Sequence, residues 1–308
     1  MIVIPVGRTT SASQPERLDD VGLLVAADLP ATRPTSPSSP TEMIMSLFDG
    51  TVGFYRQYRP GIPATVADVL DAAVPDCQPR RLLDVGTGTG LVVEALLGRF
   101  DDIIAIDNAP GMLAAAEDAL RPQLPADAQL RLQEVTAEEF TPPAGWQAEL
   151  VTICRAFHWL DQAATLTRLD AQVSPDGAVA IFADNSFWTA TNDWKAAIRT
   201  VIQDFLGEQR RAGERTFQHH HRPYSEIMRE SPFSQVEEHA VSVIRTWTAD
   251  SILGYLHSTS FAAPQLFGDR LDAFDSAVRA TLARYSDTDT FTEDNEFLIR
   301  IGRRDRRD

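Results

Sequence analysis

Three glycines at alternate positions follow an apolar run in the segment LLDVGTGTGL, residues 82–91. An apolar run with an abrupt glycine-rich end predicts a buried strand, then a tight turn, then the start of a helix. Glycine permits a positive φ and allows a ligand to lie against the backbone. Gly86, Gly88 and Gly90 therefore predict a loop that holds an adenine-bearing cofactor.

Two carboxylates indicate which cofactor this loop suits. A dinucleotide fold requires G-x-G-x-x-G with an acid about twenty residues later for the ribose, whereas the glycines here follow G-x-G-x-G. Asp107, seventeen residues after Gly90, suits the ribose of either kind of cofactor. Asp84 stands two residues before Gly86, where its carboxylate would repel a pyrophosphate. S-Adenosylmethionine has no phosphate and carries a sulfonium and an ammonium group, so the charges favour this cofactor, with Asp84 near its ammonium end.

The elements that position these residues follow from the spacing of apolar residues. The expected strands cover residues 81–85, 102–107, 130–135, 148–157 and 177–184, and the expected helices residues 65–74, 89–100, 110–121 and 160–173. Such alternation predicts βαβ units and a mainly parallel sheet covered by helices on both faces. SPDG, residues 174–177, predicts a turn before the fifth strand.

The pattern changes after the fifth strand. A polar, helical region is expected from residue 191 to residue 230, interrupted by a loop around HHHRPY. A long strand over residues 236–247, two helices, and a last strand over residues 295–304 follow. Residues 1–42, rich in proline, serine and threonine, predict a flexible leader. The main domain is expected over residues 43–303, with a lid and acceptor region at 191–284 and a charged tail at 304–308.

Composition narrows the class of partner. The chain has 308 residues, 44% of them hydrophobic, and no apolar run long enough to cross a membrane. Its start lacks the basic region of a secretory signal, so a cytoplasmic protein is expected. A net charge of −16 disfavours nucleic acid and anionic membranes as partners. Nothing marks an oligomer interface, so a monomer and a homodimer both remain open. Cys77 and Cys154 form neither a disulfide framework nor a zinc pattern.

Five segments, in order, resemble the motifs of class I S-adenosylmethionine-dependent methyltransferases: LLDVGTGTG, AIDNAPGML, EVTAEEF, VTICRAFHWLD and QVSPDGAVAIF. Upstream, FYRQYRPGIP resembles the Y-x-x-x-R-P element of the trans-aconitate-type small-molecule branch, and residues 233–260 resemble that branch's later strand and substrate-covering segment. The similarity spans residues 48–303. It implies a doubly wound, Rossmann-like, seven-stranded sheet with the last strand antiparallel. It also implies transfer of a methyl group from S-adenosylmethionine, with S-adenosylhomocysteine as product.

The resemblance also implies which residues contact the cofactor. It places five residues around the methionine part: Asp84, Gly86, Thr87, Gly88 and Gly90. Asp107 falls on the ribose-diol position, and Asn108 and Met112 flank the adenine. Thr136 and Ala137 match the pair at the adenine edge, although many relatives carry an acid in place of Thr136.

Three upstream and downstream residues complete the expected cofactor contacts. Tyr55 and Arg59 match the Y-x-x-x-R-P element. A guanidinium can bind a carboxylate with two hydrogen bonds, so Arg59 is expected to bind the cofactor's carboxylate; the alternative is a surface salt bridge. Arg155 stands where many relatives have a smaller polar side chain, and could reach either the cofactor or the acceptor.

Acceptor-binding residues are expected after the fourth and fifth strands, because open α/β sheets bind ligands at the carboxyl ends of their strands. His158 is the candidate general base, the one catalytic residue expected, and Trp159 a wall of the pocket. Asp184, Asn185 and Trp188 are expected to line the same pocket. His219, His220 and His221 are adjacent in sequence, and adjacent residues rarely converge on one ion, so no metal is expected.

The acceptor is the open question. An acidic chain whose one lysine is Lys195 suits a cationic acceptor, so the leading expectation is N-methylation of an amine, such as an aminosugar or aminoglycoside of antibiotic or other secondary metabolism. The alternative is O-methylation of a carboxylic acid or hydroxyl. Arginines gathered at the pocket would reverse that order; the candidates are Arg155, Arg210, Arg211 and Arg222. Two remote alternatives are an NAD(P)-dependent oxidoreductase and a scaffold that binds the cofactor without transferring its methyl group.

Overall fold

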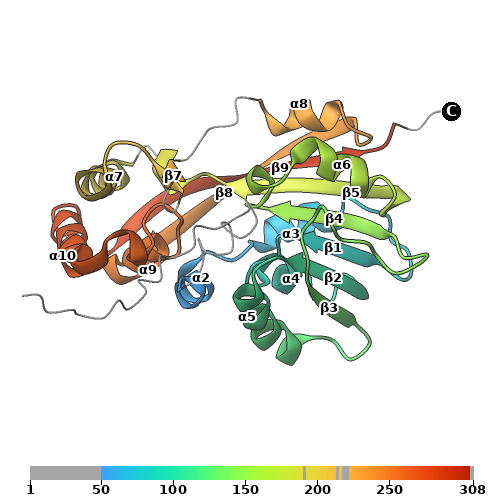
Figure 1. The fold of residues 1–308 in the computed structure, drawn as a ribbon, viewed down its shortest axis with the longest axis horizontal. Coiled ribbons are helices and arrows are strands. Elements are labelled where there is room, and N and C mark those ends of the chain that lie inside the picture. The colour runs from blue at the N-terminus through green and yellow to red at the C-terminus, as the bar shows by residue number, and fades with distance from the viewer. Residues whose placement is uncertain (1–49, 190–191, 213–214, 217–221, 306–308) are drawn as a thin grey trace, which may run out of the picture. The chain divides into compact units, whose positions relative to one another are not determined.

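The computed structural model describes residues 50–189, 192–212, 215–216 and 222–305 (Figure 1). The leader expected at residues 1–42, the three histidines 219–221 and most of the expected charged tail lie outside these described residues. In the described part of the chain, no helix is both long and apolar enough to cross a lipid bilayer. In the same residues, His, Cys, Asp and Glu side chains form no group of three or more that could hold a metal ion.

A seven-stranded sheet forms the centre of the domain. Its strand order is β3-β2-β1-β4-β5-β9-β8. The first five strands are parallel, and β9 is antiparallel to both of its neighbours. The strand bounds are β1 Arg81–Val85, β2 Asp102–Asp107, β3 Gln129–Glu134, β4 Ala148–Cys154, β5 Val173–Asp184, β8 Gln235–Trp247 and β9 Phe291–Arg303. The predicted doubly wound sheet, with its last strand antiparallel, is therefore confirmed.

Apolar side chains on both faces of the sheet explain the two helical layers (Figure 1). One face packs against α3 (Ala64–Asp71), α4 (Leu91–Leu96) and α5 (Pro110–Leu120). The opposite face packs against α6 (Gln162–Leu169) and α8 (Tyr224–Arg229). Because both faces are covered, the central strands read as continuous apolar runs, as the sequence indicates.

A third apolar cluster lies at the end of the long β8–β9 pair. Trp247 and Phe291, which pair across those strands, pack with residues of α7 (Asp193–Leu206), α9 (Ala249–His257) and α10 (Leu271–Leu282). The helix α2 (Val52–Tyr58) packs against α9. The described chain also has five short 3₁₀ helices: Arg121–Gln123, Phe157–Trp159, Phe187–Thr189, Pro264–Leu266 and Gly268–Arg270.

Two predicted boundaries, the start of the fifth strand and the end of the helix after the glycine loop, were wrong, and one element was missed. The strand β5 begins at Val173, so SPDG is not a turn before it; the register with β4 jumps from Ala148–Val173 to Leu150–Ala178, and the four residues bulge within the strand. The helix α4 ends at Leu96, because Gly98 takes a φ of 77° that an α-helix cannot continue. A small hairpin, β6 (Arg211–Ala212) with β7 (Arg215–Thr216), was not predicted.

Candidate cofactor and acceptor site

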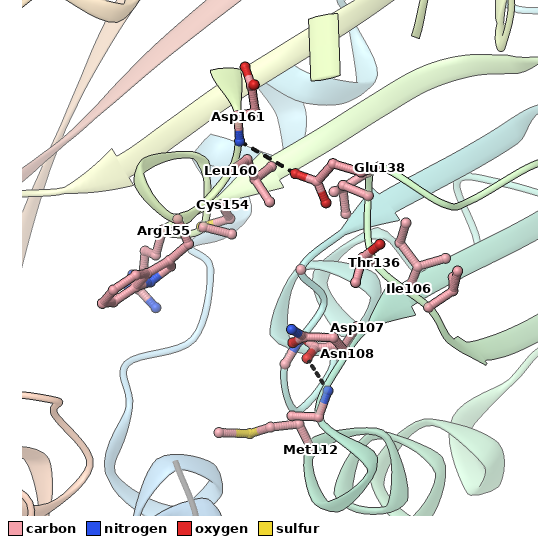
Figure 2. Close-up of a pocket in the computed structure, with 18 of the residues that line it drawn as sticks. Ile106, Asp107, Asn108, Met112, Thr136, Glu138, Cys154, Arg155, Leu160 and Asp161 are labelled. Carbon is pink, nitrogen blue, oxygen red and sulfur yellow. Dashed lines mark hydrogen bonds between the residues drawn. The ribbon is translucent and has the colours of Figure 1, made fainter. Parts of the chain in front are cut away.

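A cavity of about 310 Å³ lies at the carboxyl ends of β1, β2 and β4 (Figure 2). Figure 2 shows Asp107, Asn108 and Met112 on one side of it, with Cys154, Arg155 and Leu160 across from them. Of the residues expected at the cofactor, the lining contains nine: Tyr55, Gly86, Gly88, Asp107, Asn108, Met112, Thr136, Ala137 and Arg155. This is the edge of the sheet where a ligand of a doubly wound fold is expected.

The glycine loop joins β1 to α4 beneath this cavity. Gly88 has a φ of 54° and faces the cavity, so a side chain there would be strained and would occupy the ligand's space. Gly90 caps α4 with a φ of 82°, and a Cβ there would lie 2.7 Å from Cδ1 of Leu120. Gly90 and the buried Thr87 are therefore not lining residues, and what Gly90 provides is close packing of the loop against α5.

Asp107, the last residue of β2, organises the loops around it. Its Oδ2 accepts a hydrogen bond from the backbone N–H of Gly88 at 2.8 Å, and its Oδ1 accepts one from Ala109 at 2.9 Å. Burial raises the pKa of this carboxyl, and the two backbone N–H groups act in the opposite direction. Each carboxylate oxygen has a second lone pair, so the carboxylate can also accept hydrogen bonds from two neighbouring hydroxyls, such as a ribose diol.

Asp84 lies under the glycine loop, 1% exposed. Its Oδ1 accepts a hydrogen bond from the Thr152 hydroxyl at 2.7 Å, while its Oδ2 is buried and has no hydrogen-bond partner. Burial raises its pKa to about 6, and the Thr152 hydroxyl offsets part of that rise. Asp84 is therefore a buried carboxylate with one underused oxygen, which a nearby cation would stabilise in its charged form.

Two loops meet over the cavity, in a contact that the sequence did not reveal. The backbone N–H of Asp161, after β4, donates to Oε1 of Glu138, after β3, at 3.4 Å (Figure 2). The predicted adenine-edge residue Thr136 donates to Glu139 at 3.0 Å. Glu138, Leu160 and Asp161 were missed as lining residues; the one sequence signal was their adjacency to the predicted pairs Thr136–Ala137 and His158–Trp159.

A second cavity, of about 430 Å³, adjoins the first and shares Tyr55, Arg155, Ala156 and Trp159 with it. The predicted acceptor residues His158, Asp184 and Asn185 line this cavity. The ring of His158 lies 4.6 Å from that of Trp159, centroid to centroid. The predicted acceptor residue Trp188 does not line this cavity. It packs edge-on against Phe261, which does line it.

Arginines dominate the charge of the second cavity. Five of them line it, and Asp184 is the one carboxylate among the described lining residues. That carboxylate already forms an ion pair with Arg155 at 2.7 Å. The five are Arg59, Arg155, Arg210, Arg222 and Arg300. Arg300, from β9, was missed by sequence reasoning, and the Arg211 side chain lies outside the described part of the structure.

The guanidinium of Arg59, the residue after α2, lies over two tyrosine rings. Its guanidinium carbon lies 4.8 Å from the ring centroid of Tyr55 and 4.9 Å from that of Tyr255. One Nη2–H donates to the carbonyl of Ser258 at 3.1 Å, and no carboxylate of the described residues pairs with it. Among the described residues, Arg59 therefore does not form the surface salt bridge that was the alternative to carboxylate binding. Arg59 lines the second cavity and not the first.

The residues present fit S-adenosylmethionine. The first cavity is large enough for a small cofactor, the Asp107 carboxylate suits a ribose diol, and the underused oxygen of Asp84 suits a nearby cation. Met112 and Val135 supply apolar surface for an adenine. A pyrophosphate would favour a basic side chain at the glycine loop. The residues of this loop that line the cavity, Gly86 and Gly88, provide none.

Comparisons with known proteins agree with this geometry. Residues 82–177 match the family model described as a methyltransferase domain. An uncharacterised methyltransferase of Mycobacterium tuberculosis is 29% identical over 218 residues, which cover 70% of this chain and 78% of that protein. A trans-aconitate 2-methyltransferase of Delftia acidovorans is 32% identical over 139 residues, 44% of this chain and 49% of that protein.

Solved structures give the same fold. A candidate type II methyltransferase from Anaeromyxobacter dehalogenans superposes with a TM-score of 0.52 at 18% identity, over 80% of this chain and 98% of that one. The glycine loop, the acid at the end of β2 and the antiparallel last strand are thus found together with a methyltransferase family match. The matched methyltransferase domain, the methyltransferase relatives and the shared fold together support a class I S-adenosylmethionine-dependent methyltransferase, with S-adenosylmethionine as its cofactor.

Proposed function

We propose that this enzyme transfers a methyl group to a carboxylate oxygen of a small anionic acid, forming a methyl ester. The observation that carries the proposal is the arginine-lined second cavity beside the cofactor cavity. The sulfonium of S-adenosylmethionine supplies the methyl group: its C–S bond breaks as the new C–O bond forms. A carboxylate brings its own electron pair, so no proton has to be removed.

Two neighbouring arginines give the cavity its preference for anions. The pKa of Arg210 is lowered, first by burial, while the charge of Arg59 acts in the same direction and Tyr255 opposes both. Arg59 has no carboxylate partner among the described residues, and its Nε is buried without a hydrogen bond. A bound carboxylate would accept charge-assisted hydrogen bonds from such a pair and relieve their mutual repulsion.

The positive cavity also explains why the net charge of the chain is a poor guide to the acceptor. A charge of −16 is spread over the whole molecule, and salt screens exposed charges beyond about 8 Å at physiological ionic strength. At the acceptor itself the arginines are near, and the side chains of Arg155 and Arg300 are only 13% and 17% exposed, so a protonated amine would be repelled. The relative named trans-aconitate 2-methyltransferase takes an acceptor of the anionic class.

The expected lid segment, residues 191–284, supplies much of this wall. Arg210, Arg222, Tyr224, Tyr255 and Phe261 come from it, and they face lining residues that follow β4 and β5. Tyr55 and Trp159 line both cavities, so they lie where the two cavities adjoin. In this proposal the main contribution of the protein is alignment, which provides on the order of 7–11 kcal/mol in the best intramolecular models.

Matched acceptors test the proposal. Each carboxylic acid of a panel is compared with its own amide and with the amine of the same skeleton, and S-adenosylhomocysteine formation is followed at saturating S-adenosylmethionine. Turnover with an acid but not with its amide is the expected result. Turnover with amines alone would reject the carboxylate proposal and return N-methylation to first place.

A further inference from the structure

A buried chain of alternating charges runs from the junction of the two cavities to the lid helix α7. Arg155 Nε donates to Oδ1 of Asp184 at 2.7 Å, and Arg245 Nη1 forms an ion pair with Oδ2 of the same carboxylate at 2.8 Å. Arg245 Nη1 also lies 3.9 Å from Oε1 of Glu293. Glu293 in turn forms an ion pair with Lys195 of α7. The five side chains are between 2% and 13% exposed.

The backbone conformation and the hydrogen bonds of Arg155 fix the position of its side chain. It follows β4 with a φ of 56°, a region that non-glycine residues seldom occupy and in which the backbone is strained. Its backbone N–H donates to Phe182 at 3.1 Å, and its Nη1 donates to the carbonyl of Pro60 at 3.3 Å. Its Nη2 is buried and has no hydrogen-bond partner. Arg155 lines both cavities, so its guanidinium lies near the place where cofactor and acceptor would meet.

Arg245 lies behind this arrangement, on β8, and lines neither cavity. Arg155 and Arg245 share more than the Asp184 carboxylate: their guanidinium carbons lie 5.6 Å and 5.7 Å from the ring centroid of the same buried Phe297. Without Arg245, one oxygen of Asp184 would lose its partner, and the carboxylate could turn away from Arg155. A change at Arg245 would then reach the ligands only through Asp184 and Arg155.

We propose that Arg245 is a positioning residue: through Asp184 it holds the Arg155 guanidinium so that Nη2 binds a carboxylate at the junction of the two cavities. That carboxylate belongs either to the methionine part of the cofactor or to the acceptor. The acceptor source rests on the proposed function, whereas the cofactor source does not. Glu293 and Lys195 extend the same chain into the lid, so the lid helix α7 contributes to the alignment.

Ligand binding, measured by calorimetry on the full-length protein, tests this without turnover. The variants are Arg245→Met, Asp184→Asn and Arg155→Met, with Arg245→Lys as the conservative replacement. S-Adenosylhomocysteine carries the amino-acid carboxylate, 5′-methylthioadenosine lacks the whole amino-acid part, and citrate, added with S-adenosylhomocysteine present, serves as the carboxylate probe for the acceptor cavity.

The expected result is a loss of about tenfold in affinity for one carboxylate ligand in Arg245→Met, with 5′-methylthioadenosine affinity unchanged and partial recovery in Arg245→Lys. A loss for S-adenosylhomocysteine assigns the carboxylate to the cofactor, and a loss for citrate assigns it to the acceptor. The double variant Asp184→Asn/Arg245→Met should lose little more than either single variant, because both act through Arg155.

Arg80→Met is the matched control. Arg80 is similarly buried (side chain 12% exposed), is paired with Asp71 at 2.6 Å and lies 4.8 Å from the ring centroid of Phe100, but it lines neither cavity. The Arg80→Met variant should lose stability and no ligand affinity.

If Arg245→Met fails to fold, Arg245→Lys and Asp184→Asn carry the test. The proposal is overturned if neither S-adenosylhomocysteine nor citrate binding differs from wild type, or if 5′-methylthioadenosine affinity falls as much as the others. An enzyme that esterifies no acid but loses S-adenosylhomocysteine affinity in these variants would reject the proposed function alone.

Discussion

Gly254 of α9 lies directly against the ring of Tyr58 in α2: a Cβ at residue 254 would be 2.2 Å from Cδ2 of that ring. The same helix α2 carries Tyr55 and is followed directly by Arg59, whose guanidinium donates a hydrogen bond to the carbonyl of Ser258, just after α9. The absence of a side chain at residue 254 thus lets α2 lie close against α9, and Tyr55 and Arg59 line the cavities from there.

Gly254→Ala should therefore displace α2. Overpacking of this kind costs about 1–3 kcal/mol, and the displaced Arg59 should also weaken acceptor binding. Urea denaturation and acceptor KM measure the two effects. Gly53→Ala, within α2 itself, is the control, since a Cβ there meets no atom within 4 Å. Equal effects of the two substitutions would show that the Gly254–Tyr58 contact does not position α2.

Asp107→Asn should weaken binding of S-adenosylhomocysteine by about 10- to 100-fold, because hydrogen bonds to a charged group contribute about 1.5–3 kcal/mol. Asp102→Asn, at the opposite end of β2, provides the comparison: it weakens contacts with Arg131 and Trp146 but is remote from the cavity lining. It should reduce stability and leave S-adenosylhomocysteine affinity unchanged. A similar affinity for wild type and Asp107→Asn would contradict the ribose role of Asp107.

The buried carboxyl of Asp84 should make stability depend on pH. Its pKa is about 6 in the folded protein and near 3.8 when unfolded. Between those values the folded state binds more protons, so the free energy of unfolding falls as pH rises from about 4 to about 6. Asp84→Asn should remove that fall, and the gain of the variant over wild type should grow by up to about 3 kcal/mol across this range. Denaturation curves at several pH values measure it; a constant difference would contradict the shifted pKa.

Arg210→Gln should raise the KM for an acid acceptor by about ten- to a hundredfold. The kcat and the S-adenosylhomocysteine affinity should change little, because Arg210 lines the second cavity but not the cofactor cavity. Arg279→Gln in α10 is the control for removal of an arginine outside the cavities; Arg279 is 53% exposed and pairs with Asp250. An unchanged KM in Arg210→Gln would remove this arginine from acceptor binding.

His158→Gln should lower kcat by less than about tenfold, because a carboxylate acceptor needs no general base and such a base typically provides 10²- to 10⁴-fold. His239→Gln, on β8 and paired with Glu237, controls for removal of an imidazole elsewhere. A fall of several hundredfold, together with the loss of one limb of the pH–rate profile, would instead assign His158 as base for an amine or hydroxyl acceptor.

Local pattern predicted the parallel half of the fold well. The bounds of β1 and β2 agree with their apolar runs, and Asp107 and Gly88 lie at the cavity because the carboxyl ends of parallel strands meet at one edge. The bulge in β5 was hidden, because SPDG has the composition of a turn although its neighbours continue the ladder.

Contacts between distant segments were not predictable from local pattern. Arg300 reaches the second cavity from β9, and Arg245 reaches Asp184 from β8. Nothing near either residue in sequence indicates that β9 lies beside β5 or that β8 lies beside β9. The expectation of an amine acceptor depends on the net charge, which counts the whole surface. The carboxylate proposal depends instead on the few side chains that the fold gathers at the second cavity.

The identity of the methylated atom tests the central claim most directly. Wild-type enzyme is given S-adenosylmethionine labelled in its methyl group, with acids, amines and phenols together, and the labelled product is then treated with mild alkali. The carboxylate proposal predicts that the label is released as methanol, as expected of a methyl ester. Label that stays on an alkali-stable N-methyl or aryl ether product would contradict it.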